Sequence, residues 1–255
     1  AVAYQGTDVD GWLKTLSISA DGATLSVVQS LEYNNTRGQY ADMINTSGLI
    51  WAIAFCGNAL GSLGAIRTVS ISLDGATLTP VAIFNFDADT CTYPTILPVA
   101  GDIYIVAYQG PDNDGFIKTL DISQDGVTMS VVDTLEFDEV NGNWPSMVAV
   151  SGDIYAVAYS GADPIANATV VKSIHVADDG TLGAVQGSLV FDAEAATYSH
   201  IFYVRGYFPD PGVYGIIYKQ GTDMNLVTVD IETLEEASGT PGLTVAFALL
   251  DIGLM

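Results

Sequence analysis

Positive charge is scarce in this 255-residue chain, which has seven lysines and arginines against 30 aspartates and glutamates. A formal net charge of −23 repels phosphate backbones and anionic headgroups, so we expect no nucleic-acid partner and no membrane insertion. It also repels further copies of the chain, unless cations screen the charge or bridge carboxylates, so self-assembly would be mediated by cations. Aspartate is also a preferred turn residue, which explains part of its abundance.

Long apolar runs are missing as well. The longest apolar stretch, residues 243–250, is too short to span a bilayer, and we find no signal peptide. Because the chain begins with Ala1 inside a repeat, we expect a processed or trimmed form of a protein. No linker rich in Pro, Gly or Ser interrupts the chain, so we expect one domain covering residues 1–255.

Catalytic signatures and metal-binding side chains are equally sparse. The sequence has no Gly-rich phosphate loop, no Gly-x-Ser-x-Gly elbow and no His-x-x-x-His pair. The two cysteines, Cys56 and Cys91, fall in loops on the same face of the predicted fold, where a disulfide needs Cα atoms within about 7 Å. A disulfide, two buried free thiols and a metal site all stay open, and a disulfide would place the protein outside the cytosol.

What the chain does contain is a repeat. A phrase similar to Ile105-Val106-Ala107-Tyr108-Gln109-Gly110 occurs five times. Its aromatic residue stands at Tyr4, Phe55, Tyr108, Tyr159 and Tyr218. A period of about 50 residues built from short strands is typical of β-propeller blades. The sequence therefore predicts an all-β, five-bladed β-propeller of four-stranded antiparallel blades.

The turns within each repeat support this architecture. Asp-Gly dipeptides stand between apolar runs at residues 21–22, 74–75, 125–126 and 179–180. Asp-Gly in this context predicts a tight hairpin with a type I′ turn.

The ends of the chain predict how the propeller closes. Residues 1–6 read as the second strand of a blade whose first strand is missing, and residues 244–249 have the length of such a strand. We therefore expect residues 244–249 to pair with residues 1–6 and close the ring. In a competing assignment, residues 244–249 form the last strand of the fifth blade and the first blade keeps three strands.

Candidate binding residues precede or begin the first strand of each blade. An aromatic residue is followed two positions later by a polar one, and alternation along a strand points both side chains the same way, toward the axial mouth. The pairs are Tyr40 with Asp42, Tyr93 with Thr95, Trp144 with Ser146, and Tyr198 with His200. The aromatics either wedge between blades as core or form platforms for a small ligand such as a sugar.

Two loops carry a calcium-like pattern in which aspartates alternate and glycine follows. They contribute Asp8 and Asp10 in one loop and Asp112 and Asp114 in the other. Calcium loops of known type need further oxygen ligands downstream, which these loops lack, so an ordinary hairpin turn is the alternative.

An enzymatic function would require carboxylates in the axial pocket. A propeller-type glycan-active hydrolase would use Asp42 and His200 there. The other acids near that rim are expected in solvated turns: Asp87, Asp89, Asp138, Glu139, Asp192 and Glu194.

In its repeats the chain resembles the β-propeller modules of microbial cell-surface and secreted proteins. The resemblance spans essentially the whole chain and rests on the Ala-Tyr-x-Gly and Asp-Gly signals, whereas the Gly-His and Trp-Asp marks of WD40 repeats are missing. It implies a non-catalytic recognition, adhesion or structural module outside the cell or at its surface. The partner would be a glycan or another surface protein.

Overall fold

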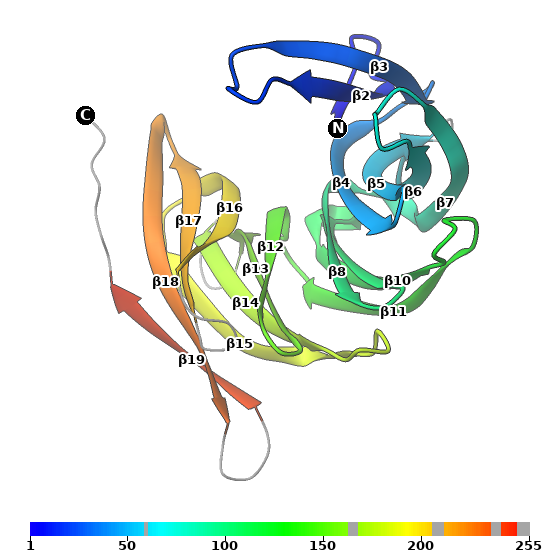
Figure 1. Cartoon of the computed structure of the whole chain (residues 1–255). Helices are drawn as coiled ribbons and strands as arrows, with labels where there is room; N and C mark the ends of the chain where they lie inside the picture. Colours follow the sequence, from blue (N-terminus) through cyan, green and yellow to red (C-terminus); the bar gives the residue numbers. More distant parts are fainter. Residues whose placement is uncertain (59–60, 163–167, 206–211, 236–240, 249–255) are drawn as a thin grey trace. The chain divides into compact units, whose positions relative to one another are not determined.

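The computed structural model consists of successive antiparallel β-sheets, coloured along the chain in Figure 1. It describes residues 1–58, 61–162, 168–205, 212–235 and 241–248. In these ranges the only helical element is a 3-10 turn, η1 (Pro111–Asn113). No helix in this described part is long and apolar enough to cross a membrane.

Five sheets follow one another in the order of the sequence repeats. The first has three strands, β1 (Val2–Gln5), β2 (Gly11–Ile18) and β3 (Leu25–Asn34). The second has β4 (Gln39–Ser47), β5 (Ile50–Asn58), β6 (Gly61–Ile71) and β7 (Leu78–Thr90). The third has β8 (Thr92–Ala100), β9 (Ile103–Gln109), β10 (Gly115–Ile122) and β11 (Met129–Asp138).

The last two sheets also have four strands each. The fourth has β12 (Asn143–Ser151), β13 (Ile154–Gly161), β14 (Ala168–Val176) and β15 (Leu182–Asp192). The fifth has β16 (Ala196–Arg205), β17 (Gly212–Gln220), β18 (Asp223–Glu235) and β19 (Pro241–Ala248). Each sheet is a meander of neighbouring strands, which confirms the five antiparallel blades of a five-bladed propeller.

The predicted closing strand is wrong. Residues 244–248 belong to β19, which pairs with β18 in the register Val245 to Ile231 and Phe247 to Val229. The C-terminal strand therefore completes the fifth blade, and the first blade keeps three strands with β1 at its edge. The competing assignment was correct, because a short connection favours pairing with the preceding strand of the chain.

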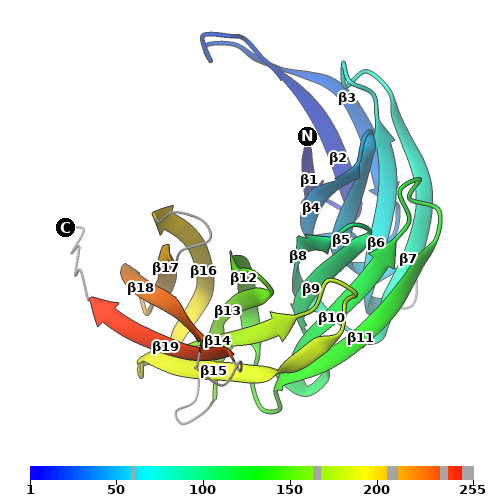
Figure 2. The same ribbon diagram turned by 60° about the horizontal axis from the view of Figure 1, so that its bottom comes forward.

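The residues group into two compact units. Unit 1 comprises residues 1–106 and 120–132, and unit 2 comprises residues 107–119 and 133–255. The division runs through the third sheet, so β9, β10 and β11 contribute to both units. Figure 2 shows the same strands from a second direction. A single domain over residues 1–255 stays a prediction.

Neighbouring blades within a unit pack through the phrase that defines the repeat. In unit 1, Phe55 of β5 is fully buried and meets Tyr33 of β3 edge to face, with ring centroids 5.2 Å apart. In unit 2, Tyr159 of β13 is fully buried and meets Phe137 of β11 at 4.9 Å. The repeated aromatic therefore forms core between blades.

A second repeated contact joins three of the four Asp-Gly hairpins to the preceding blade. The hydroxyl of Thr15 donates to the carbonyl of Gly75 at 2.7 Å, and that of Thr68 donates to the carbonyl of Gly126 at 2.7 Å. In unit 2, Thr119 donates to Gly180 in the same way. These bonds satisfy threonine hydroxyls that lie buried between sheets.

The hairpins are confirmed, but their turn type differs from the prediction. Gly22 has a positive φ of 71° while Asp21 does not, and the Gly22 N–H donates to the carbonyl of Ser19 at 2.8 Å. The carboxylate of Asp21 accepts from the Ser19 hydroxyl at 2.6 Å and the Ala23 N–H at 3.0 Å. These bonds make a longer loop than the two-residue type I′ turn, in which both central residues need positive φ.

Candidate functional site

The first strands of the four-stranded blades share an irregular start centred on the predicted aromatic residue. This residue has a left-handed φ in every blade: Tyr40 54°, Tyr93 52°, Trp144 49° and Tyr198 56°. Pairing with the second strand shifts register at this point in three blades: between Gln39 and Asp42, between Asn143 and Ser146, and between Thr197 and His200. A bulky residue with positive φ is a conformational outlier, and a β-bulge re-aims its side chain.

These aromatics meet in pairs within each unit. In unit 1, the rings of Tyr40 and Tyr93 lie 4.1 Å apart at a tilt of 40°. In unit 2, the rings of Trp144 and Tyr198 lie 5.1 Å apart at a tilt of 43°. Each pair therefore joins the starts of two consecutive first strands.

The paired aromatics are accessible to solvent. Tyr40 is 38% exposed and Tyr198 is 55% exposed, while Tyr93 and Trp144 are half-buried. Of the two alternatives left open by the sequence, a fully buried position between blades does not fit Tyr40 and Tyr198, whereas Tyr93 and Trp144 are partly covered by them. The core aromatics are those of the repeated phrase.

The polar residues of the predicted site tie first strands together. The Oδ2 atom of Asp42 accepts the Ile96 N–H at 2.9 Å and the Thr95 hydroxyl at 3.3 Å. Its Oδ1 atom accepts the Met43 N–H at 2.9 Å. Both carboxylate oxygens of Asp42 are thus occupied by donors from its own strand and from β8.

Unit 2 repeats this arrangement with different chemistry. The Ser146 hydroxyl oxygen accepts the Ile201 N–H at 3.2 Å and lies 3.0 Å from Nδ1 of His200. The Ser199 hydroxyl adds a bond to the Trp144 carbonyl at 3.1 Å. A serine beside a histidine can act as a catalytic nucleophile. Ser146, however, is only 8% exposed, and its hydroxyl oxygen already accepts the backbone N–H of Ile201. The arrangement acts as a structural tie.

The structure thus divides the eight predicted residues into two groups of four. One group holds Tyr40, Asp42, Tyr93 and Thr95 in unit 1, and the other holds Trp144, Ser146, Tyr198 and His200 in unit 2. Within each group the polar pair fixes the strands and the aromatic pair is presented to solvent. Such exposed aromatic faces can stack on the apolar face of a ring-shaped ligand.

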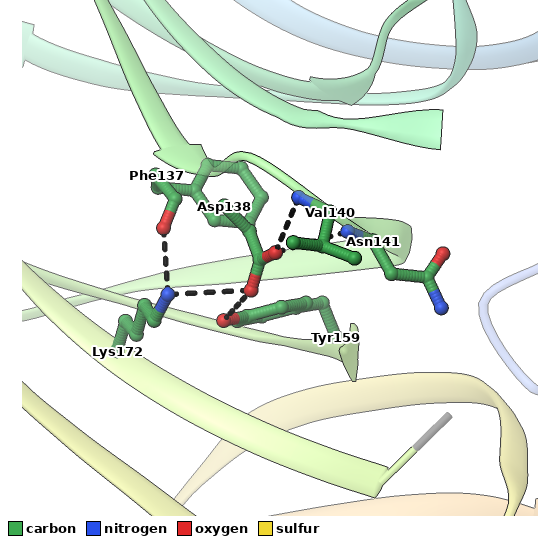
Figure 3. Close-up of polar contacts among 6 residues, drawn as sticks. All are labelled: Phe137, Asp138, Val140, Asn141, Tyr159 and Lys172. Carbon is green, nitrogen blue, oxygen red and sulfur yellow. Dashed lines mark hydrogen bonds and ion pairs between the residues drawn. The ribbon is translucent and has the colours of Figure 1, made fainter. Parts of the chain in front are cut away.

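A cluster missed by sequence reasoning surrounds Asp138 at the end of β11 (Figure 3). Asp138 is 6% exposed, so its predicted place in a solvated turn is wrong. Its carboxylate accepts the Tyr159 hydroxyl at 2.7 Å and approaches Nζ of Lys172 at 3.3 Å. Lys172 also donates to the Phe137 carbonyl at 2.7 Å.

The environment of Asp138 favours its charged form. Burial alone would raise the pKa of this carboxyl, but hydrogen bonds from the Asn141 N–H at 2.9 Å, the Tyr159 hydroxyl and the Val140 N–H at 3.1 Å, together with nearby Lys172, lower the pKa below its ordinary value. Asp192 at the end of β15 likewise accepts the Tyr218 hydroxyl at 2.7 Å.

The sequence did contain a signal for this cluster. An aromatic residue followed by Asn or Asp stands at or near the end of the last strand in the first four blades: Tyr33-Asn34, Phe86-Asp87, Phe137-Asp138 and Phe191-Asp192. Four of the seven Lys and Arg residues stand at the same position of the repeat. This position lies in β2 of the first blade and in the third strand of the next three blades: Lys14, Arg67, Lys118 and Lys172. Acidic residues and Lys or Arg residues that recur at fixed positions of the repeat indicate that their side chains interact with one another rather than with solvent alone.

Cys56 and Cys91 lie together in unit 1, as the shared loop face predicted. Both side chains are buried, and their sulfur atoms are 2.7 Å apart as free thiols. The backbone around them is ordered by the Cys91 N–H, which donates to the Ser62 carbonyl at 2.7 Å. The disulfide itself stays a prediction.

The two predicted calcium loops are closed by their own backbones. The Gly6 N–H donates to the Asp10 carbonyl at 2.7 Å, and the Gly110 N–H donates to the Asp114 carbonyl at 2.8 Å. Across the described ranges, no group of three or more His, Cys, Asp or Glu side chains is arranged to hold a metal ion. Calcium at Asp8 and Asp10 or at Asp112 and Asp114 stays a prediction.

Comparison with known proteins supports the fold. No protein-family model and no curated protein matches the sequence. The structure is similar to that of a protein from Lactobacillus plantarum, with a TM-score of 0.56, 14% identity, and coverage of 95% of this chain and 66% of that one. It is also similar to a periplasmic gluconolactonase from Pseudomonas aeruginosa, with a TM-score of 0.53, 13% identity, and coverage of 96% and 81%.

A third similar structure is Sqt1 from Saccharomyces cerevisiae, with a TM-score of 0.56, 8% identity, and coverage of 98% of this chain and 59% of Sqt1. This chain therefore spans less than two thirds of Sqt1 and of the Lactobacillus protein. At such identities the similarity extends to the propeller fold alone.

Proposed function

We propose that this propeller is a non-catalytic recognition module, outside the cell or at its surface, that binds a neutral glycan on its exposed aromatic pairs. The observation that carries the proposal is the pair formed by Trp144 and Tyr198, whose rings lie 5.1 Å apart with Tyr198 55% exposed. Exposed aromatic side chains on a rigid β-scaffold bury the apolar face of a sugar ring at small cost in conformational entropy.

Local backbone geometry supports a binding role for these side chains. Trp144 and Tyr198 both occupy left-handed φ, which costs about 1–3 kcal/mol for a residue other than glycine. Glycine would relieve this strain, and the ring of Tyr198 lies 55% exposed rather than in the core. Strain retained at an exposed position is typical of functional sites.

Electrostatics support a neutral ligand. With a net charge of −23, the protein repels uronic acids, sialic acids and sulfated sugars over a Debye length of about 8 Å at physiological salt. Two of the similar structures belong to proteins named for reactions of sugars. One is the gluconolactonase, at 13% identity, and the other is an exo-β-1,3-galactanase in complex with β-1,3-galactotriose, at 8% identity. These likenesses are compatible with the proposal and do not identify a ligand.

The alternative of a glycan-active hydrolase around Asp42 and His200 stays a prediction. Asp42 accepts three hydrogen bonds and His200 contacts Ser146, so both have structural roles in their own units. A hydrolase needs a second carboxylate as acid or nucleophile. Release of reducing sugar from a glycan that binds would favour the hydrolase.

The proposal is tested on an array of neutral and acidic glycans, with and without calcium. Wild-type protein should bind neutral glycans, and Trp144→Ala and Tyr93→Ala should each lose signal. The matched control is Tyr203→Ala, which removes a 52% exposed tyrosine of β16 outside the aromatic pairs and should bind as wild type does. Absence of neutral glycan binding by the wild-type protein, or equal binding by all variants, would contradict the proposal.

A further inference from the structure

The edge of the first blade is a second candidate for recognition, and it borders the aromatic pair of unit 1 at Tyr40. The first sheet has the order β1-β2-β3, so β1 lies at its edge, whereas in the other four blades the corresponding strands β5, β9, β13 and β17 each have neighbours on both sides. An edge strand presents unpaired N–H and C=O groups that can pair with another extended chain.

The sequence of β1 indicates which kind of strand can pair with its edge. Ala1-Val2-Ala3-Tyr4 is identical to Ala156-Val157-Ala158-Tyr159 of β13. In the fourth blade, β12 pairs with that tetrapeptide in the register Ser146 to Ala158, Met147 to Val157 and Val148 to Ala156. A strand with the sequence of β12 therefore has the same four residues to pair with at β1.

Exposure shows that, among the residues the structure describes, no strand covers this side of β1. Residues 156–159 of β13 are all fully buried, whereas Val2 is 46% exposed and Ala3 and Tyr4 are half-buried. On the far side, β1 pairs with β2 just as β13 pairs with β14, with Val2 opposite Lys14 and Val157 opposite Lys172. The two strands thus have equivalent surroundings on one side and different surroundings on the other.

The start of the second blade supplies two more contacts for an added strand. The N–H groups of Ile96 and Ile201 donate to a polar side chain of the preceding first strand, Asp42 or Ser146. The equivalent N–H in β4 belongs to Met43 and donates to its own Asp42 at 2.9 Å. A serine or threonine hydroxyl on an added strand could accept the Met43 N–H, as Asp42 accepts the Ile96 N–H and Ser146 accepts the Ile201 N–H.

The second contact is aromatic. Tyr93 and Tyr198 each have a ring from the preceding first strand against them, at 4.1 Å and 5.1 Å. Tyr40 has Tyr93 on its following side and is 38% exposed. An aromatic residue two positions before the serine of the added strand would reach Tyr40 by the same geometry.

We propose that the edge of β1 binds an extended peptide in which an aromatic residue, a small residue, Ser or Thr, and two aliphatic residues follow one another. The peptide becomes a fourth strand of the first blade, its aromatic stacks on Tyr40, and its hydroxyl accepts the Met43 N–H. An acidic peptide is disfavoured because the carboxylate of Asp42 lies beside that N–H and the whole chain is acidic.

The probe is a labelled nonapeptide with the sequence of residues 143–151, Asn-Trp-Pro-Ser-Met-Val-Ala-Val-Ser, titrated with the full chain by fluorescence polarisation. We expect saturable 1:1 binding. The Ser146→Ala change in the peptide should weaken binding about fivefold, as expected for one neutral hydrogen bond. A scrambled peptide of the same composition should not bind.

Changes in the protein locate the peptide. Tyr40→Ala should weaken binding about tenfold by removing the stacking partner, while Tyr203→Ala, on an unrelated first strand, should leave it unchanged. Amide hydrogen exchange of residues 2–5 should slow when the peptide is bound. Peptide binding and amide exchange are both measured without a glycan. Failure of the peptide proposal can therefore be told apart from failure of the glycan proposal.

Three results would overturn this inference. The first is no saturable binding of the nonapeptide at millimolar concentration. The second is binding that Tyr40→Ala does not weaken. The third is amide protection of residues 2–5 in the free protein equal to that of residues 156–159, because the edge is then already covered by this chain or by a second copy.

Discussion

The carboxylate of Asp42 in β4 accepts the backbone N–H of Ile96 in β8 at 2.9 Å. In the other unit, the hydroxyl of Ser146 in β12 accepts the N–H of Ile201 in β16 at 3.2 Å. Two chemically different side chains thus perform one task, which is to join consecutive first strands beside an aromatic pair. The position two residues after each aromatic is therefore structural, and the aromatic itself is left available to a ligand.

Removal of the Asp42 carboxylate should destabilise the protein. Asp42→Ala leaves the N–H groups of Ile96 and Met43 without their acceptor, which should cost about 1–3 kcal/mol of unfolding free energy. Urea unfolding measures this cost. Asp89→Ala is the control, since Asp89 accepts only the neighbouring Thr90 N–H at an exposed site, and it should change stability by less than about 0.5 kcal/mol. Equal stability of the two variants would contradict the structural role of Asp42.

Tyr198→Gly separates a binding role from a packing role. Tyr198 is 55% exposed at a φ of 56°, which glycine adopts without strain. Relief of strain should offset the lost ring contact and the greater chain entropy, so stability should stay within about 1 kcal/mol of wild type. Calorimetric melting checks this. A loss of about 3–5 kcal/mol, as for deletion of a core aromatic, would show that Tyr198 is packed in the core.

The cluster around Asp138 predicts a specific dependence of stability on pH. Because the folded-state pKa of Asp138 lies below its unfolded value, this group stabilises the fold above the unfolded pKa and loses that contribution as pH falls through the folded pKa. Asp138→Asn should therefore be less stable than wild type at neutral pH, and the gap should narrow below about pH 4. Urea unfolding at several pH values measures it. A gap independent of pH would contradict the charged state of buried Asp138.

The equivalent contact between the first and second blades suggests how this cluster can be rebuilt. There, Asn34 replaces the acid and Phe55 replaces the tyrosine, while Arg67 donates to the Tyr33 carbonyl at 3.0 Å. The double variant Asp138→Asn with Tyr159→Phe should thus lose less stability than the sum of the single variants. A double-mutant cycle should give a coupling of about 0.5–3 kcal/mol, whereas additive losses would contradict the pairing.

Cys56 and Cys91 should form a disulfide when the protein is exposed to oxidised glutathione. Their sulfur atoms are already 2.7 Å apart and buried, so closure needs little movement. Mass spectrometry of unreduced peptides should show one cross-link, and reduction should lower stability by about 2–4 kcal/mol. Rapid alkylation of both thiols in the native protein after this treatment would contradict it.

The fold was predictable because its signals are periodic. The phrase around Tyr108 and the Asp-Gly hairpins recur at the blade period, and each copy forms an antiparallel meander. The closing strand was not predictable, since the apolar pattern of residues 244–249 suits the last strand of one blade as well as the first of another. Pairing with β18 was decided by proximity along the chain.

The site was predictable only as a set of residues. Alternation along a strand predicted that Tyr40 and Asp42, and likewise Trp144 and Ser146, point the same way, because local spacing cannot reveal a β-bulge or a left-handed φ. Those features aim the aromatics at solvent and the polar groups at the next strand. Asp138 was misassigned because its partners, Tyr159 and Lys172, lie more than 20 residues away.

The most direct test of the account observes Trp144 while a sugar binds. With Trp12 and Trp51 replaced by phenylalanine, Trp144 becomes the only tryptophan of the chain, and its fluorescence reports on its pairing with Tyr198. Titration with the neutral oligosaccharide that gives the strongest array signal should produce a saturable change in emission, and Tyr198→Gly should abolish this change while stability stays within about 1 kcal/mol of wild type. No change in emission at saturating sugar, or an unchanged titration in Tyr198→Gly, would contradict glycan recognition at the aromatic pairs.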